Sequence, residues 1–233
     1  MKAAVLRFPG SNCDQDAHLA LTQLGVPTEY VWHKDTSVAG FDLIVAPGGF
    51  SYGDYLRCGA IARFSPIMKA VVDAANHGGL VMGICNGFQI LCEAGLLPGA
   101  LIRNKNLHFV CEHIRVRVEN YQTPWTCAAW TGTSLRIPVA HGEGSYIANL
   151  ETLKELNRNR QVLLRYCDLR GAITEAANPN GSLENIAGIC NSARNVFGLM
   201  PHPERACDSR LGSIDGVIIF QSILQHLGVK AAA

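Results

Sequence analysis

The sequence feature that most constrains the fold is the junction Gly-Ile-Cys-Asn-Gly at residues 83–87, which joins an apolar run to a helix-forming stretch. Residues 80–84 are predicted to form a buried strand and residues 86–94 a helix. A sharp turn from strand to helix brings the chain close to itself, so small residues are needed two positions before and two after its apex. Both positions are glycine here. The junction therefore predicts an α/β fold with Cys85 at the apex of the turn.

Predicted strands and helices alternate along the first hundred residues, which indicates βαβ units and a mostly parallel sheet covered on both faces. Later segments add alternating or apolar runs that predict antiparallel strands, followed by a terminal amphipathic helix. No repeat or linker interrupts the chain, so one domain over residues 2–228 is expected. The predicted strands are 3–8, 29–32, 43–46, 80–84, 109–119, 186–190 and 196–200, and the predicted helices are 14–24, 67–75, 86–94 and 214–227.

Composition excludes several classes of protein. Twenty basic residues against 19 acidic ones leave a formal charge of +1, so no broad basic surface for nucleic acid is expected. Nine cysteines without a Cys-x-x-Cys pair argue against a disulfide framework and a zinc ribbon, and favour the cytoplasm. No apolar run approaches the roughly 18 residues of a membrane span, and the first residues lack a signal-peptide pattern.

Cys85 is the candidate nucleophile. At the apex of the turn it also stands at a helix N-terminus, where free N–H groups and the helix dipole favour a thiolate. The backbone amide of Asn86 would face the oxygen of an attacked carbonyl. The alternative is a small buried core cysteine, as free cysteines often are.

His202 and Glu204 are the candidate base and orienting carboxylate. They lie in the segment Pro-His-Pro-Glu-Arg at residues 201–205, after an apolar strand. Pro203 favours an extended conformation at His202, which would project both side chains to the same side. A solvated loop is the alternative for the segment alone, but a Cys-His-Glu triad is favoured together with the turn at Cys85.

Two glycine-containing segments are candidates for substrate contact. Gly48 and Gly49 follow a predicted strand, and their amides are accessible to a ligand oxygen, as an oxyanion hole requires. His141 and Gly142 combine a strand end with a polar side chain, as a recognition loop does. His141 is also a rival base, with Glu143 as its nearest carboxylate in the sequence.

Two other motifs are interpreted as structural. His108, Cys111 and His113 resemble metal ligands, but strand alternation would place the first on the opposite face from the others, and no fourth ligand is near. The turn at residues 9–12 precedes a helix as phosphate-binding turns do. It lacks a G-x-G-x-x-G pattern and a P-loop lysine, and acidic residues follow it. No metal site is predicted.

The order of these motifs resembles that of the class I, triad-type glutamine amidotransferases. Within that class, the chain resembles the glutaminase subunits of phosphoribosylformylglycinamidine synthase from about residue 2 to residue 227. The segments that carry this resemblance are RFPGSNCD at 7–14, PGGFSYGD at 47–54, GICNGFQ at 83–89, RVEN at 117–120 and PHPER at 201–205.

The resemblance implies a flavodoxin-like, doubly wound fold and a glutaminase that supplies ammonia for the conversion of formylglycinamide ribonucleotide to the amidine in purine synthesis. It implies that Cys85 attacks glutamine, that His202 moves protons and that Glu204 orients His202. It further suggests that Gly48 or Gly49 and Asn86 hold the oxyanion, and that Gln89, His141 and Gly142 lie near the amino acid part of glutamine.

The resemblance also implies partners. Because Met1 directly precedes the first predicted strand, the chain looks like the free-standing form of the glutaminase, which works with a separate synthetase subunit and a small accessory subunit. No cofactor is expected in this chain, and ATP and magnesium are expected on the synthetase.

Two other functions compete. One is a thiol hydrolase or chaperone of the flavodoxin-like intracellular-protease family, in which a His commonly follows the nucleophile, whereas Asn86 stands there in this chain. The other is a non-catalytic binding subunit with the same fold, which should lack at least one member of the triad. All three members are present.

Overall fold

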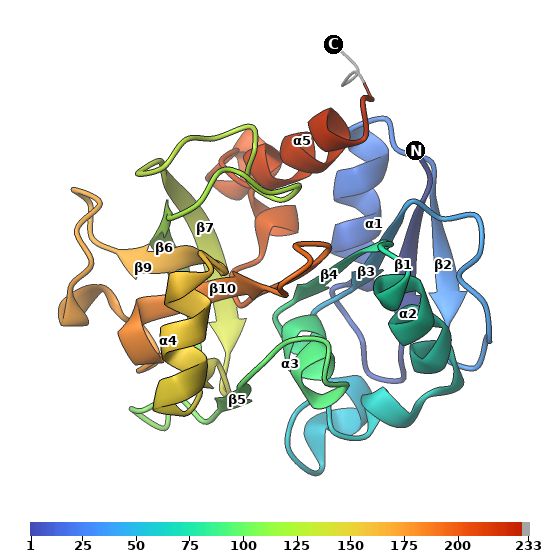
Figure 1. Cartoon of the computed structure of the whole chain (residues 1–233), viewed down its shortest axis with the longest axis horizontal. Helices are drawn as coiled ribbons and strands as arrows, with labels where there is room; N and C mark the ends of the chain where they lie inside the picture. Colours follow the sequence, from blue (N-terminus) through green and yellow to red (C-terminus); the bar gives the residue numbers. More distant parts are fainter. Residues whose placement is uncertain (230–233) are drawn as a thin grey trace.

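A nine-stranded mixed sheet forms the centre of the computed structural model, which describes residues 1–229 (Figure 1). The strands are β1 (Ala3–Arg7), β2 (Thr28–Trp32), β3 (Leu43–Ala46), β4 (Leu80–Ile84), β5 (Ala100–Ile102), β6 (Val110–Val118), β7 (Ser134–His141), β8 (Ser145–Ile147), β9 (Val162–Cys167), β10 (Ile186–Cys190) and β11 (Val196–Leu199). The helices are α1 (Asp14–Gln23), α2 (Pro66–Asn76), α3 (Asn86–Glu93), α4 (Leu150–Arg158) and α5 (Val217–His226). Short 3-10 segments are η1 (Ser51–Asp54), η2 (Ala62–Phe64), η3 (Glu175–Ala177), η4 (Leu183–Asn185), η5 (Pro203–Ala206) and η6 (Ser209–Leu211).

The strand order is β2-β1-β3-β4-β11-β10-β9-β6-β7. The strands from β2 to β11 pair in parallel, in the order of a flavodoxin-like sheet, and those from β10 to β7 continue it with antiparallel pairs. This confirms the predicted α/β fold with antiparallel additions. The remaining strands, β5 and β8, pair separately with each other.

Helices cover both faces of the parallel part: α1 and α5 lie on one side, and α2 and α3 on the other (Figure 1). The central strands β3 and β4 beneath them are apolar throughout, and every residue of both is buried. Helix α2 turns its apolar residues Ile67, Met68 and Val71 inward, with Pro66 at its first position. The core of the molecule therefore runs through the parallel strands on both faces.

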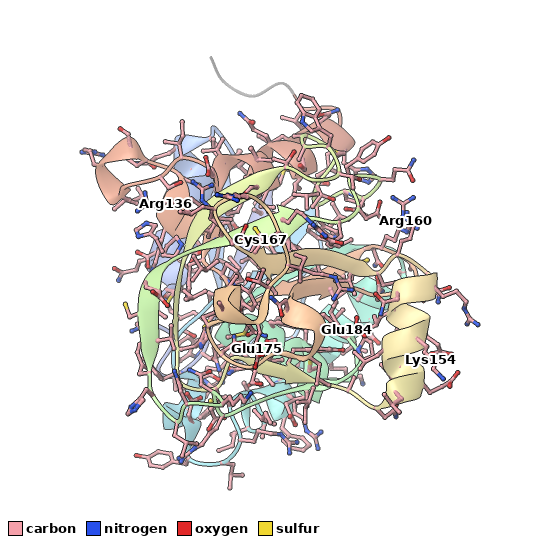
Figure 2. The ribbon with its side chains drawn as sticks, turned by 90° about the vertical axis from the view of Figure 1, so that its left-hand side faces the viewer. Arg136, Lys154, Arg160, Cys167, Glu175 and Glu184 are labelled. Carbon is pink, nitrogen blue, oxygen red and sulfur yellow. The ribbon has the colours of Figure 1, made fainter. Side chains whose placement is uncertain are left out.

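Five elements between residues 100 and 167 have no sequence prediction: β5, β7, β8, α4 and β9. Asn149 caps α4 by accepting a hydrogen bond from the Thr152 amide at 2.8 Å. In Figure 2, which faces this side, Lys154 points outward from α4 and Glu184 lies close to the helix. Glu184 pairs with Arg165 of β9 at 3.2 Å. Among the described residues, no helix has the length and apolar character needed to cross a membrane.

The carboxyl ends of three neighbouring strands meet at one edge of the sheet. Ala46 at the end of β3 pairs with Gly83 of β4, and Ile84 at the end of β4 pairs with Leu199 of β11. The Cys85 amide then donates to the Leu199 carbonyl at 2.7 Å. The turns that follow these strands are therefore neighbours, although they are far apart in the sequence.

Candidate active site

The turn between β4 and α3 has the geometry predicted for it. Cys85 has φ 51° and ψ −105°, a conformation that side chains other than glycine rarely adopt. A Cβ atom on Gly83 would lie 2.7 Å from the carbonyl of Gly87, and one on Gly87 would collide with the carbonyl oxygen of Ala46. Both glycines are therefore required by close backbone contact, and together they hold Cys85 at the apex.

The Cys85 side chain lies at the start of α3 and is 5% exposed. Its thiol donates to the carbonyl of Ala140 in β7 at 3.7 Å. The first amides of a helix have no intrahelical acceptor, and the dipole there favours negative charge. The position therefore suits a sulfur that acquires negative charge.

His202 and Glu204 form a buried pair beyond the end of β11. The Nδ1 atom of His202 lies 2.6 Å from Oε1 of Glu204, and the two residues are 1% and 3% exposed. The amide of His202 donates to the carbonyl of Pro138 at 2.8 Å, which ties the segment to β7. The predicted pairing is present, but the extended conformation is wrong for Glu204, which lies in the 3-10 segment η5.

The electrostatic state of His202 follows from its neighbours. Burial alone would lower the pKa of its imidazole, but the charges of Glu204 and Cys85 outweigh burial and raise that pKa to about 10. Its Nε2 atom is buried and has no hydrogen-bond partner among residues 1–229. His202 therefore has one nitrogen fixed by a carboxylate and the other left open for chemistry beside Cys85.

The turn at residues 47–49 lies against this pair. A Cβ atom on Gly48 would lie 2.8 Å from Cε1 of His202, so the turn packs directly on the imidazole ring. In the part of the chain that the structure describes, the amides of Gly48 and Gly49 donate no hydrogen bond. The amide of Asn86, first in α3, has no intrahelical acceptor. Gly48, Gly49 and Asn86 thus provide three unused backbone donors, and the oxyanion hole remains a prediction.

The side chains of Asn86 and Gln89 link three segments of the site. Asn86 accepts from the Ser51 amide at 3.1 Å and donates to Gln89 Oε1 at 2.8 Å. Gln89 in turn donates to the carbonyl of Glu143 at 2.6 Å. These side chains are buried and already hydrogen-bonded, so they hold the loops around Cys85 in place.

His141 lies at the end of β7, but without a carboxylate partner. Its ring nitrogens face Asn104 Oδ1 at 3.2 Å and Asn180 Nδ2 at 3.5 Å. Burial, together with the charge of His202, lowers the pKa of His141 to about 4. His141 is therefore neutral and held by amides, whereas His202 has the carboxylate that a triad base needs. A Cβ atom on Gly142, next in the chain, would lie 3.7 Å from Cδ2 of Phe109.

Cys13 also belongs to the site, although the sequence analysis gave it no role. Its sulfur, a ring nitrogen of His202 and a carboxylate oxygen of Glu204 lie within 4.8 Å of one another. This is the one group of three metal-type ligands among residues 1–229, and its sulfur faces the guanidinium of Arg205 at 3.1 Å. Its position in the sequence could have indicated a place in the site. Cys13 follows the turn after β1, and the turns after parallel strands lie together at one edge of the sheet.

The residues His108, Cys111 and His113 do not gather into a metal-type cluster in the described structure. Cys111 and His113 lie in β6, which begins at Val110. His108 precedes that strand, so the predicted alternation of faces does not apply to it.

Comparisons with known proteins agree with this geometry. The model of the CobB/CobQ-like glutamine amidotransferase domain matches residues 1–214. The chain is 58% identical over 228 residues to the phosphoribosylformylglycinamidine synthase subunit PurQ of Acaryochloris marina, with 97% of each chain covered. It is 58% identical over 225 residues to the same subunit of Moorella thermoacetica, covering 96% of this chain and 95% of that one. A chain in the structure of PurLQS from Thermotoga maritima superposes with a TM-score of 0.86 at 46% identity, covering 97% of this chain and 98% of the other.

Proposed function

This chain belongs to the CobB/CobQ-like glutamine amidotransferases and, among them, to the PurQ subunits of phosphoribosylformylglycinamidine synthase, so we propose that it hydrolyses glutamine with Cys85, His202 and Glu204. The chain is the glutaminase subunit of an enzyme of purine biosynthesis. The observation that carries the assignment of residues is the buried His202–Glu204 pair with an open Nε2 beside the strained turn at Cys85.

In the first half of the reaction, the Cys85 sulfur attacks the side-chain amide carbon of glutamine, and His202 Nε2 holds the proton that the thiol gives up. A carbon–sulfur bond forms, and the carbonyl oxygen becomes an oxyanion. The carbon–nitrogen bond then breaks while His202 returns the proton to the leaving nitrogen. Ammonia leaves, and a thioester remains on Cys85.

In the second half, His202 takes a proton from a water molecule, and the resulting hydroxide attacks the thioester carbon. The carbon–sulfur bond breaks, glutamate leaves and the sulfur regains the proton. The new carboxylic acid releases its proton, so the balance is glutamine plus water to glutamate, ammonia and a proton. Glu204 exchanges no proton with the substrate, because its role is to fix the His202 ring by accepting from Nδ1.

The oxyanion needs donors that are free before the substrate arrives. The amides of Gly48 or Gly49 and of Asn86 meet that requirement, since they have no other acceptor among residues 1–229. We place Gln89, His141 and Gly142 around the amino acid part of glutamine. Gln89 of α3 donates to the Glu143 carbonyl in the loop after β7, so α3 and this loop lie together on that side of the site.

The ammonia must reach an acceptor before water converts it to ammonium. We infer that a synthetase subunit, which binds ATP and magnesium, receives it, and that a small accessory subunit completes the complex. The similarity to a chain of the PurLQS structure supports this assembly. All nine cysteines are free, which supports a reducing compartment such as the cytoplasm.

Replacement of the nucleophile tests the proposed function. In the complex with the synthetase, Cys85→Ala should lower glutamate release by at least about 10³-fold, because no other group can form the thioester. Synthesis from added ammonium should persist, because that step lies on the partner. A diazo-ketone analogue of glutamine should label Cys85 alone among the nine cysteines.

Cys92→Ala is the matched control, since Cys92 lies in the same helix away from its first turn. It should keep the wild-type rate of glutamate release. Activity retained in Cys85→Ala, or label spread over several cysteines, would contradict the assignment.

A further inference from the structure

The turn at residues 9–13, which carries no phosphate-binding signature, lies alongside the proposed oxyanion turn. The amide of Phe50 donates to the Gly10 carbonyl at 3.1 Å, and Ser11 forms an isolated antiparallel bridge with Gly49. The Cys13 amide approaches the Gly48 carbonyl at 3.4 Å. The two turns are therefore joined along their backbones, as two short strands would be.

The contact between the turns leaves no room for side chains. A Cβ atom on Gly49, whose φ is +130°, would lie 2.7 Å from the amide nitrogen of Asn12. One on Gly10, whose φ is +87°, would collide with the carbonyl oxygen of Phe50. Because the backbones touch, a shift of the turn at residues 9–13 must move the oxyanion turn with it.

The side chain of Cys13 fills the space between this contact and the base. It is 4% exposed, and its sulfur lies 3.1 Å from the position that a Cβ atom of Gly48 would take. The sulfur accepts from Arg205 Nη2 at 3.1 Å, and Arg205 is anchored to Asp16 at 2.9 Å. Its thiol donates to Asn12 Oδ1 at 3.4 Å.

We propose that Cys13 is a positioning residue that sets the oxyanion donors of Gly48 and Gly49 at the correct distance from His202 and Cys85. It does so by filling the gap between the turn and the Arg205 guanidinium while its backbone bonds to Gly48. The inference rests on the proposed function, because it concerns the same oxyanion.

A chemical role for this thiol is disfavoured. Burial raises the pKa of Cys13 to about 12, although the Arg205 charge opposes that rise. The thiol is therefore neutral, and its hydrogen bonds as donor and acceptor fit that state. Cys13 acts on the reaction only through the groups that it positions.

The effect of Cys13 is separable from that of the nucleophile. Iodoacetamide reacts with the Cys85 sulfur by displacing iodide, a step that forms no oxyanion and needs no oxyanion donors. Glutamine hydrolysis needs both the sulfur and the donors. Loss of donor position therefore slows hydrolysis while leaving alkylation unchanged, and a general structural defect slows both.

In the complex with the synthetase, Cys13→Ala should lower kcat for glutamate release by about ten- to a hundred-fold, the usual cost of misplacing catalytic groups by about 1 Å. KM for glutamine should change by less than about three-fold, because the interaction is made in the transition state. The rate of iodoacetamide alkylation at Cys85, followed by peptide mapping, should stay within about two-fold of wild type. Should the alanine variant fail to fold, Cys13→Ser, which keeps an acceptor for Arg205, carries the same comparison.

Cys190→Ala is the control for deleting a buried thiol. Cys190 is fully buried in β10 and pairs with Phe197 near the start of β11, at the opposite end from His202. Cys190→Ala should change neither kcat for glutamate release nor the rate of alkylation at Cys85. A Cys13 variant with wild-type kcat, or one in which alkylation falls in parallel with kcat, overturns the inference. Glutamate release that persists in Cys85→Ala would instead overturn the proposed function.

Discussion

The state of a single residue, His202, decides how the triad begins its cycle. Burial opposes charge on the ring, but the charges of Glu204 and Cys85 outweigh burial and keep the pKa near 10. The raised pKa favours the protonated ring at neutral pH. The proton that the leaving nitrogen requires is then in place before glutamine binds.

Removing the carboxylate should weaken catalysis less than removing the base. Glu204→Gln keeps the shape of the pair but loses the charge that orients His202, whereas His202→Ala removes the proton carrier itself. We expect turnover to fall by about ten- to ten-thousand-fold in each, with the larger loss in His202→Ala. Steady-state glutaminase assays should show a nearly unchanged KM for Glu204→Gln.

The rival base provides the control for this prediction. His141→Gln should largely keep kcat and at most raise KM for glutamine, because His141 is neutral, has no carboxylate partner and is placed beside the amino acid part of the substrate. A fully active His202→Ala together with an inactive His141→Gln would transfer the role of base to His141.

The buried pair of His202 and Glu204 also predicts that the stability of the fold depends on pH. The folded-state pKa of His202 is raised, so the stability gained from its charge is complete below the ordinary value near 6.5 and is lost as the pH rises through about 10. The free energy of unfolding, measured by urea denaturation, should therefore decline from pH 7 to pH 10. His202→Asn combined with Glu204→Gln removes the ionisable pair and should decline less. Equal slopes would show that the pair does not contribute.

At the scale of elements, the parallel half of the sheet and the turn at Cys85 could be predicted because its central strands, β3 and β4, are short apolar runs bounded by glycine or proline. The strand β7 was missed because Pro138 interrupts its alternating pattern. Proline is tolerated there because β7 is the last strand of the sheet. Pro138 still pairs with His113 and accepts from the His202 amide.

The candidate site was predictable only in part, because only some of its residues lie in segments with a recognisable local pattern. Cys85, His202 and Glu204 lie in segments whose local pattern reveals a turn or a neighbouring pair. Cys13 acquires its place from the order of strands, which brings the end of β1 close to the turn after β3. Local sequence patterns do not contain that information.

The close backbone contact at Gly87 predicts how a substitution there changes stability. Gly87→Ala places a methyl group on the Ala46 carbonyl, so β3 and α3 must separate, which should lower the free energy of unfolding by about 1–3 kcal/mol. Gly78→Ala is the comparison, because its side chain would meet nothing within 4 Å and the left-handed conformation costs only about 1 kcal/mol. Thermal denaturation should rank Gly87→Ala as the less stable. The reverse ranking would show that the close approach relaxes freely.

At the scale of the whole molecule, the site lies where the parallel and antiparallel halves meet. Cys85 follows β4 of one half, while its thiol and the His202 amide both bond to carbonyls of β7 in the other. The oxyanion turn is followed by Tyr52, Gly53 and Asp54, all with positive φ, and then by Tyr55, which is 87% exposed. This strained segment with an exposed ring is suited to control by a partner.

We expect the isolated chain to hydrolyse glutamine slowly, and the synthetase and its ligands to raise the rate by at least about ten-fold, or roughly 1.4 kcal/mol of barrier. A partner that shifts the strained segment would move the oxyanion donors by the small distances to which catalysis is sensitive. Glutamate release at saturating glutamine, with and without the partners, measures this. An isolated chain at the full rate would show that its oxyanion hole is preformed.

The place of β11 between β4 and β10 has a consequence for the newly made protein. The nucleophile emerges from the ribosome long before the base, and the two meet only when β11 inserts beside β4. Until residues 196–206 have been synthesised and the hairpin of β10 and β11 has closed the sheet, the thiol at the apex has neither His202 nor its carboxylate. An unfinished chain that lacks these residues therefore cannot consume glutamine.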